Sequence, residues 1–259
     1  MEQIKIKNSK GQNIAAVVKY STKPYQRLAV LCPGYLDTKD YAHLVALAEK
    51  LTEKGYTAVS FDPTGTWESG GDIAEYSNTQ YLEDIRSVLE HMLKRENFTD
   101  ILLGGHSRGG QLSILYAARD PRVSAVVAIM PSSGGVQGAR REEWEKSGYS
   151  FSKRDLPDGK SGIKEFNVPF SHVLDRDQYD VIGDVKKIKA PIIFIAGELD
   201  EMCPPEEVKE IFDTANEPKK YIFLKNIGHN YRHSQSEIEI VNREIMKNLF
   251  PYTAIAVRN

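Results

Sequence analysis

A serine between glycines is the residue of this 259-residue chain best suited to act as a nucleophile. The run Gly105-His106-Ser107-Arg108-Gly109 follows the apolar stretch Ile101-Leu102-Leu103 and precedes a helical pattern over 111–119. In a Gly-x-Ser-x-Gly pattern, the small residues let the backbone turn so tightly that the serine hydroxyl stands clear of the chain. The spacing therefore predicts a strand, a sharp turn with Ser107 at its tip, and a helix.

The same glycine-rich turn could instead hold a phosphate group. A P-loop would end in Gly-Lys-Ser or Gly-Lys-Thr, and a dinucleotide site would show Gly-x-Gly-x-x-Gly with an acidic residue about twenty positions further on. Residues 104–110 match neither pattern. The nucleophile is the better interpretation.

A serine hydroxyl also needs a general base, and the base needs a partner that orients it. His229 follows the last expected strand and Asp200 follows the strand before it. Both would lie with Ser107 at the carboxyl edge of a parallel sheet. Glu198 and Glu201 compete with Asp200, which we favour because a shorter carboxylate holds an imidazole more rigidly.

The sequence contains six histidines. His233, four residues after His229, is the main competitor for the role of base. We expect the other four to be packed or surface residues: His43, His91, His106 and His172.

The attacked carbonyl oxygen gains negative charge, which backbone N–H groups can stabilise. One donor is expected from Arg108, directly after the serine. The other is expected from Tyr35, in the loop after the strand 28–32, where Gly34 allows close backbone approach.

Alternating short β-branched runs and amphipathic segments predict a mostly parallel sheet covered by helices on both faces. Six strands are expected at 28–32, 57–61, 100–104, 123–130, 191–196 and 221–225. Two more, 4–6 and 14–20, are expected to form an antiparallel hairpin at one edge, giving about eight strands. Apolar residues at helical spacing predict helices around 44–51 and 82–93.

The strand and helix rhythm breaks between residues 132 and 188, where we expect an insertion that carries its own short helices and acts as a lid. Its aromatic residues could line an acyl or aryl pocket or only anchor the insertion. Its basic residues could contact a substrate carboxylate or form a solvated face: Arg140, Arg141, Lys153 and Arg154. The candidate substrate contacts of the whole chain are Trp67, His106, Trp144, Tyr149 and Phe170.

Four parts of the chain resemble the α/β-hydrolase superfamily: Cys32–Tyr35, Phe61–Ser69, the Ser107 turn, and the surroundings of Asp200 and His229. The resemblance covers about residues 28–250 and is to small single-domain carboxylesterases, including a feruloyl-esterase-like group with a short lid. It implies one α/β-hydrolase domain over 1–259, with no metal or cofactor. The chain departs from many relatives at Gly65–Ser69, where Trp67 stands in place of a common glycine.

The composition limits which kinds of molecule the protein is expected to bind. With 34 basic and 36 acidic side chains the net charge is −2, which disfavours nucleic acid. Cys32 and Cys203 are expected to be reduced, and the absence of a signal-like or membrane-spanning apolar run predicts a cytoplasmic protein. A small-molecule ester is the expected partner, and a homodimer is left open.

These observations predict a serine hydrolase that cleaves carboxylic esters of small acyl or aryl substrates through an acyl-enzyme. Thioesterases, amidases and carbon–carbon bond hydrolases use the same three residues and stay open as alternatives. Dehalogenases and epoxide hydrolases have a carboxylate at the nucleophile position and dienelactone hydrolases a cysteine, so Ser107 argues against them. The alternative from another class is a ligand-binding receptor on a hydrolase scaffold.

Overall fold

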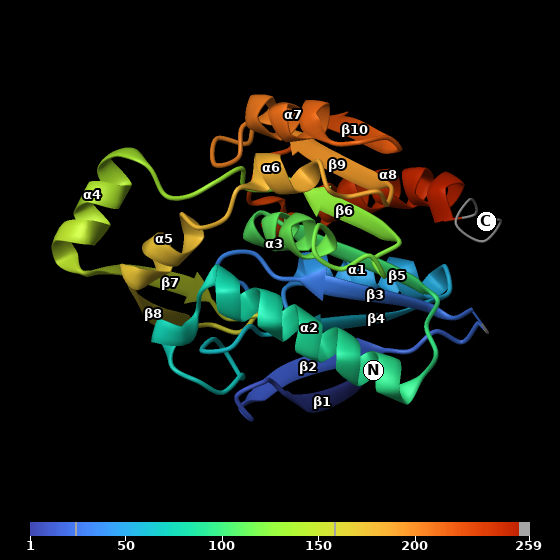
Figure 1. The fold of residues 1–259 in the computed structure, drawn as a ribbon, viewed down its shortest axis with the longest axis horizontal. Coiled ribbons are helices and arrows are strands. Elements are labelled where there is room, and N and C mark those ends of the chain that lie inside the picture. Colours follow the sequence, from blue (N-terminus) through green and yellow to red (C-terminus); the bar gives the residue numbers. More distant parts are fainter. Residues whose placement is uncertain (24, 158, 254–259) are drawn as a thin grey trace.

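The computed structural model describes residues 1–23, 25–157 and 159–253. Within them, eight strands form one sheet in the order β1-β2-β4-β3-β5-β6-β9-β10 (Figure 1). The strands are β1 (Glu2–Lys7), β2 (Asn13–Lys19), β3 (Arg27–Cys32), β4 (Tyr56–Phe61), β5 (Asp100–His106), β6 (Ala125–Ile129), β9 (Ile192–Gly197) and β10 (Lys219–Leu224). The pairs β1–β2 and β2–β4 are antiparallel, and the others are parallel.

Helices cover both faces of this sheet. On one face, apolar residues of α2 (Asn78–Arg95), α3 (Arg108–Ala117) and α7 (Pro205–Thr214) join one buried cluster. On the other, α1 (Ala42–Glu53) and α8 (Gln235–Thr253) contribute to a second cluster. Burial on both faces explains why β4, β5, β6 and β9 are buried along their whole length.

The predicted fold is confirmed in its sheet, its edge hairpin and the helices on both faces. The strand boundaries differ by a few residues: β5 continues two residues beyond the predicted 100–104, and the predicted strand 123–130 is shortened to Ala125–Ile129. Two short 3-10 helices, η1 (Ile73–Glu75) and η2 (Tyr231–His233), complete the main body. Within the described residues, no helix combines the length and apolarity needed to cross a bilayer.

The segment 132–188, called here the inserted segment, connects β6 to β9 and extends to the left in Figure 1. It contains α4 (Gly138–Ser147), β7 (Tyr149–Asp155), β8 (Ile163–Pro169), α5 (Ser171–Arg176) and α6 (Val181–Val185). We expected short helices but not the antiparallel pair β7–β8, which forms a separate two-stranded sheet. Every residue of β7 is exposed or half-buried, so its sequence lacks the apolar run that reveals the central strands.

Candidate active site

Ser107 lies at a strained turn between β5 and α3. Its backbone has φ 56° and ψ −121°, a conformation that costs a non-glycine residue about 1–3 kcal/mol. A Cβ atom on Gly105 would lie 2.6 Å from the Cys32 carbonyl oxygen, and one on Gly109 would lie 2.0 Å from the same atom. The Ser107 N–H donates to the Ile129 carbonyl at 2.8 Å, which fixes the turn against β6. The glycine spacing is therefore required by close backbone contact.

Three side chains from separate parts of the sequence form one hydrogen-bonded chain. The Nε2 of His229 lies 3.0 Å from the Oγ of Ser107, and its Nδ1 lies 2.8 Å from the Oδ2 of Asp200. The other carboxylate oxygen of Asp200 accepts the backbone N–H groups of Met202 at 2.9 Å and Cys203 at 2.8 Å. Because the Asp200 side chain is 0% exposed, these contacts hold it in one orientation.

The competing residues lie elsewhere. Glu198 accepts the N–H of Asn226 at 2.9 Å, and Glu201 is exposed. His233 is exposed at the end of η2. None of the three takes part in the hydrogen-bonded chain to Ser107.

Two backbone amides are candidates for stabilising a developing oxyanion, and their residues, Tyr35 and Arg108, both line the pocket at Ser107. Arg108 begins α3, where N–H groups have no acceptor within the helix. Tyr35 follows Gly34, whose position excludes a larger residue because a Cβ there would lie 2.6 Å from the Oδ2 of Asp37. That Cβ would also lie 3.4 Å from the carbonyl oxygen of His106, so the loop after β3 runs beside the turn that carries Ser107.

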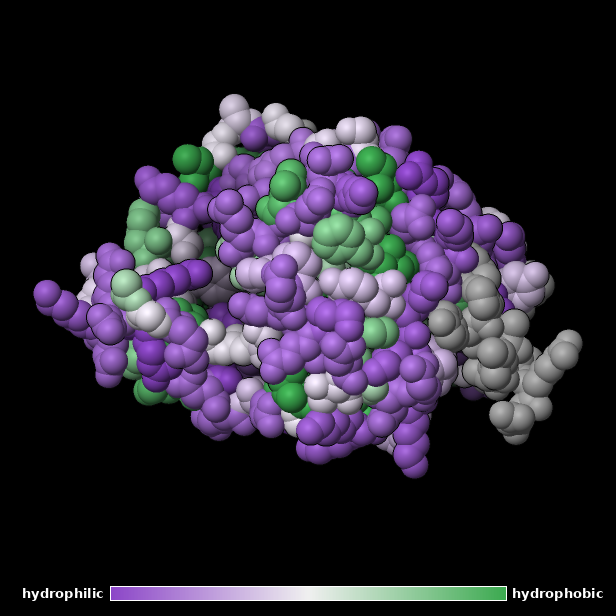
Figure 2. All heavy atoms as spheres, turned by 90° about the horizontal axis from the view of Figure 1, so that it is seen from above, coloured by the Kyte–Doolittle hydropathy of each residue, from purple (hydrophilic) through white to green (hydrophobic). Residues whose placement is uncertain are grey.

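A pocket of about 420 Å³ opens onto Ser107 between the main body and the inserted segment. In Figure 2 the surface is mostly hydrophilic and is hollowed between the inserted segment, at the left, and the body. Of the five predicted substrate contacts, His106 is the one that lines the pocket as the structure describes it. The predicted basic residues Arg140, Lys153 and Arg154 line it, and so do three charged residues that the sequence analysis did not single out: Asp37, Arg176 and Arg232.

The two tryptophans lie outside this pocket because their indoles are engaged in packing. The Nε1 of Trp67 donates to the Leu36 carbonyl at 2.9 Å. Trp144 is buried, donates to the Val168 carbonyl at 2.9 Å, and stacks on the His172 ring with 13° between the planes. Trp67 thus ties the loop 61–69 to the loop after β3, and Trp144 ties α4 to β8.

Tyr149 and Phe170 also lie away from the pocket. Tyr149 is half exposed on β7, and Phe170 is half-buried with the Arg141 guanidinium 5.7 Å from its ring centroid. Trp144 and Phe170 therefore pack against the buried core, whereas Tyr149 is exposed to solvent.

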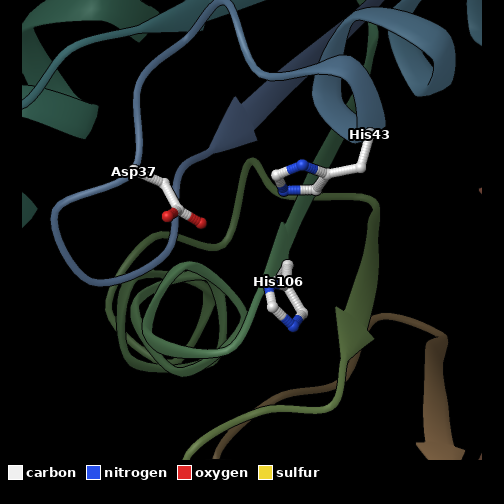
Figure 3. A group of neighbouring side chains, drawn as sticks. All are labelled: Asp37, His43 and His106. Atoms are coloured by element: carbon white, nitrogen blue, oxygen red, sulfur yellow. The ribbon is translucent and has the colours of Figure 1, made fainter. Parts of the chain in front are cut away.

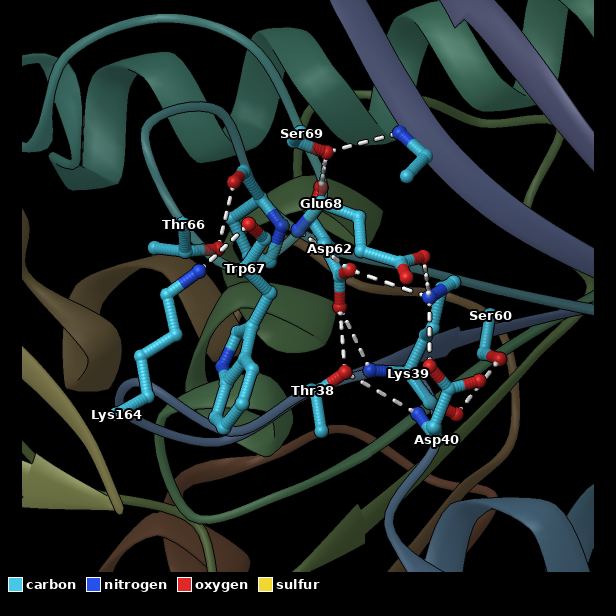
Figure 4. Close-up of polar contacts among 12 residues, drawn as sticks. Thr38, Lys39, Asp40, Ser60, Asp62, Thr66, Trp67, Glu68, Ser69 and Lys164 are labelled. Carbon is cyan, nitrogen blue, oxygen red and sulfur yellow. Dashed lines mark hydrogen bonds and ion pairs between the residues drawn. The ribbon is translucent and has the colours of Figure 1, made fainter. Parts of the chain in front are cut away.

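A buried ion network joins the loop that carries Tyr35 to the loop 61–69 (Figure 4). The Nζ of Lys39, 1% exposed, lies 2.6 Å from Asp40, 2.7 Å from Glu68 and 3.3 Å from Asp62. Burial alone would lower the pKa of Lys39, but these carboxylates outweigh it and raise that pKa above its ordinary value. The network fixes the two loops relative to each other.

Behind His229 lies a cluster with metal-ligating atoms: Asp37, His43 and His106, whose ligand atoms lie within 4.8 Å of one another (Figure 3). Within the part of the chain described, the ring nitrogens of both histidines lack hydrogen-bond partners. Burial lowers the pKa of His43 to about 3 and that of His106 well below its ordinary value, so both rings are neutral.

This cluster has residue types that zinc accepts, but its surroundings oppose a cation. The guanidinium of Arg154 lies 3.8 Å from the Asp37 carboxylate, and Arg232 also lines the adjoining pocket. The His106 ring packs 4.5 Å, between centroids, from the ring of His229. This geometry supports a packing role for His106 beside His229.

Comparisons with known proteins agree with this architecture. The family model described as "Serine aminopeptidase, S33" matches residues 23–148. The mouse protein "Palmitoyl-protein thioesterase ABHD10, mitochondrial" is 23% identical, with 82% of this chain and 71% of the relative covered. "Polyketide transferase grgF" of Penicillium sp is 27% identical, with 77% of this chain and 80% of the relative covered.

The solved structure of Est1E from Butyrivibrio proteoclasticus with ferulic acid bound superposes with a TM-score of 0.78 at 21% identity. It covers 97% of this chain and 99% of that one. The predicted resemblance to small esterases is confirmed. The chain therefore has the α/β-hydrolase fold, and the family model matches residues 23–148 of it.

Proposed function

We propose that this protein is a serine hydrolase that cleaves carboxylic esters through an acyl-enzyme intermediate. The observation that carries the proposal is the continuous hydrogen-bonded chain from Asp200 through His229 to Ser107 at the wall of a pocket. A buried carboxylate, an imidazole and a hydroxyl in this sequence are the parts that nucleophilic acyl transfer requires.

In the first half-reaction, the Oγ of Ser107 attacks the ester carbonyl carbon while the Nε2 of His229 takes the hydroxyl proton. Asp200 accepts the Nδ1–H bond and stabilises the imidazolium. The negative charge on the carbonyl oxygen is stabilised by the backbone N–H groups of Tyr35 and Arg108. The intermediate then collapses, and His229 returns the proton to the alcohol that leaves.

In the second half-reaction, water replaces the alcohol. The water oxygen attacks the acyl carbon while His229 takes a proton from that water. His229 then protonates the Oγ of Ser107 as the carboxylic acid leaves. We further propose that the inserted segment acts as a lid that closes the pocket on one side, since it supplies about half of the pocket wall.

Thioester cleavage is a second candidate, favoured by the likeness to the mouse thioesterase. It requires the same attack at the same carbon with a thiol leaving. The pocket favours short acyl groups in either case, because its apolar lining is restricted to a few residues: Tyr35, Val136, Met202 and Cys203.

A fluorophosphonate probe tests the proposal directly. We expect covalent labelling of the wild type and its loss in Ser107→Ala, with labelling retained in Ser132→Ala, which removes another hydroxyl from the same pocket wall. Turnover of 4-nitrophenyl esters and of the matching thioesters should be lost with the label. Labelling that persists in Ser107→Ala would contradict the assignment, and a wild type that binds ligands without being labelled would indicate a receptor.

A small-molecule partner, a cytoplasmic location and a homodimer belong to the same proposal. The mouse relative is named as mitochondrial, so location is best tested by fractionation of the native host. Light scattering of the purified protein tests the dimer.

A further inference from the structure

The pocket at Ser107 is strongly positive, although the chain as a whole has a net charge of −2. Among the described residues that line it, Asp37 is the single carboxylate. The positively charged side chains of the wall are Arg108, Arg140, Lys153, Arg154, Arg176 and Arg232.

Three of these charges are matched by a carboxylate nearby. Lys153 lies 3.3 Å from Glu165, Arg232 lies 2.6 Å from Asp155, and Arg154 lies 3.8 Å from Asp37. Among the ion pairs of the described residues, none includes the other three positively charged residues of the wall: Arg108, Arg140 and Arg176. Unmatched guanidinium groups facing one cavity favour the binding of an anion.

Arg176 is unmatched even though Asp175 and Asp177 flank it in sequence. Asp175 accepts the backbone N–H groups at the start of α2, at 2.6 and 3.1 Å, and Asp177 pairs with Arg141 at 2.8 Å. The Nη2 of Arg176 donates to the Ser132 hydroxyl at 3.3 Å and to the Gly134 carbonyl. Its buried Nε has no hydrogen-bond partner among the described residues. Burial, together with the charges of two neighbouring arginines, lowers the pKa of Arg176 to about 10, so a bound anion would relieve an unfavourable charge.

The unmatched charges lie close to the reacting group. The Ser132 N–H donates to the carbonyl of Ser107 at 3.3 Å, and the Ser132 hydroxyl accepts a hydrogen bond from Arg176. Ser132 therefore links Arg176 to the backbone of Ser107. The guanidinium carbon of Arg140 lies 6.0 Å from the ring centroid of Tyr35, which lines the same pocket. Arg108 is less available because its guanidinium donates twice to the Asn78 side chain, at 3.1 and 2.9 Å.

We propose that the substrate carries an anionic group, a carboxylate or a phosphate, in addition to its ester or thioester, and that Arg176 and Arg140 bind this group. The planar N–H fork of arginine matches both anions. This inference rests on the proposed function, since it names the substrate class of the same pocket.

The kinetic test uses two matched pairs of substrates. Mono(4-nitrophenyl) glutarate carries a free carboxylate, and its methyl ester does not. Butyryl-coenzyme A carries phosphates, and butyryl-N-acetylcysteamine does not. We expect the wild type to prefer the charged member of at least one pair by about tenfold or more in kcat/KM, chiefly through KM, and the pair that shows the preference identifies the anion.

The Arg176→Gln variant should lower the charged-to-neutral ratio of kcat/KM by about 10- to 100-fold, as expected for loss of hydrogen bonds to a charged group. Arg141→Gln is the matched control, because it removes the same charge from a residue that pairs with Asp177 and does not line the pocket. Its ratio should equal that of the wild type. Equal losses in the two variants would show that only the general field of the protein acts and would overturn the proposal.

A binding measurement separates this inference from the proposed function. Titration calorimetry of Ser107→Ala with glutarate and with inorganic phosphate should show binding of one of them, and addition of Arg176→Gln should abolish it. If neither anion binds and neither charged substrate is preferred, while the fluorophosphonate still labels Ser107, the anion site is refuted and the hydrolase stands. If an anion binds in an Arg176-dependent manner but no labelling or turnover occurs, the anion site stands and the proposed function fails.

Discussion

The Asp200→Asn variant tests how the hydrogen-bonded chain is oriented. In the native protein one carboxylate oxygen of Asp200 accepts two backbone N–H groups, and the other faces the Nδ1 of His229. An asparagine has to place its oxygen against the two N–H groups, because its NH₂ group there would oppose donors with donors. The NH₂ group would then face His229 and could only donate.

The consequence is the wrong tautomer of the imidazole. With its Nδ1 forced to accept, His229 carries its proton on Nε2 and points a donor at the Ser107 hydroxyl, 3.0 Å away. It cannot take the serine proton. Where the same tautomer is imposed in other enzymes of this type, kcat falls about 10⁴-fold, which corresponds to about 5.4 kcal/mol in the activation free energy.

The assay is steady-state hydrolysis of a 4-nitrophenyl ester, with circular dichroism and thermal unfolding to show that the fold is retained. Glu201→Gln is the matched control, since it removes the same charge from an exposed neighbour, and its kcat should stay within about twofold of the wild type. A kcat for Asp200→Asn within tenfold of the wild type would refute the reasoning and move the orienting role to a glutamate.

Three further predictions concern the supporting structure. Gly109→Ala should lower the free energy of unfolding by about 1–3 kcal/mol or more, because its Cβ would lie 2.0 Å from the Cys32 carbonyl oxygen; Gly134→Ala, with nothing within 4 Å, is the control in denaturant unfolding. Burial lowers the pKa of His43 to about 3 in the folded protein, whereas the ordinary pKa of histidine is about 6.5. As the pH falls from 6.5 toward 3, His43 binds a proton in the unfolded chain but not in the folded one. The free energy of unfolding should therefore fall by at most about 1.36 kcal/mol per pH unit. His43→Gln should remove that part of the slope between pH 6.5 and 4, and parallel curves for the two proteins would count against a neutral buried ring. Dialysis against EDTA should leave ester hydrolysis unchanged, and a loss restored by zinc would instead assign a metal to the cluster around Asp37.

The central sheet and the nucleophile turn could be predicted because their signals are local. A strand buried on both faces must be apolar along its length, as in the run Leu28–Cys32, and a turn as tight as that at Ser107 requires glycine at fixed spacing. The expectation that Asp200 and His229 lie near Ser107 followed from the rule that parallel strands end at one edge of the sheet.

The inserted segment could not be predicted in the same way. Its hairpin β7–β8 has few buried residues, so the pairing depends on tertiary contacts and leaves little periodic signal. The sequence also gives no sign that Arg176 lacks an ion pair, because the flanking Asp175 and Asp177 suggest local ion pairs. Only the folded chain shows that both carboxylates are used elsewhere.

The residues of the pocket wall come from two separate parts of the fold. Ser107 and His229 extend from loops at the strand ends of the rigid sheet, whereas Arg140, Lys153 and Arg176 come from a single stretch of chain between β6 and β9. We therefore expect that exchanging that stretch for one of different charge would change which substrates bind, while the hydrogen-bonded chain from Asp200 to Ser107 stays in place.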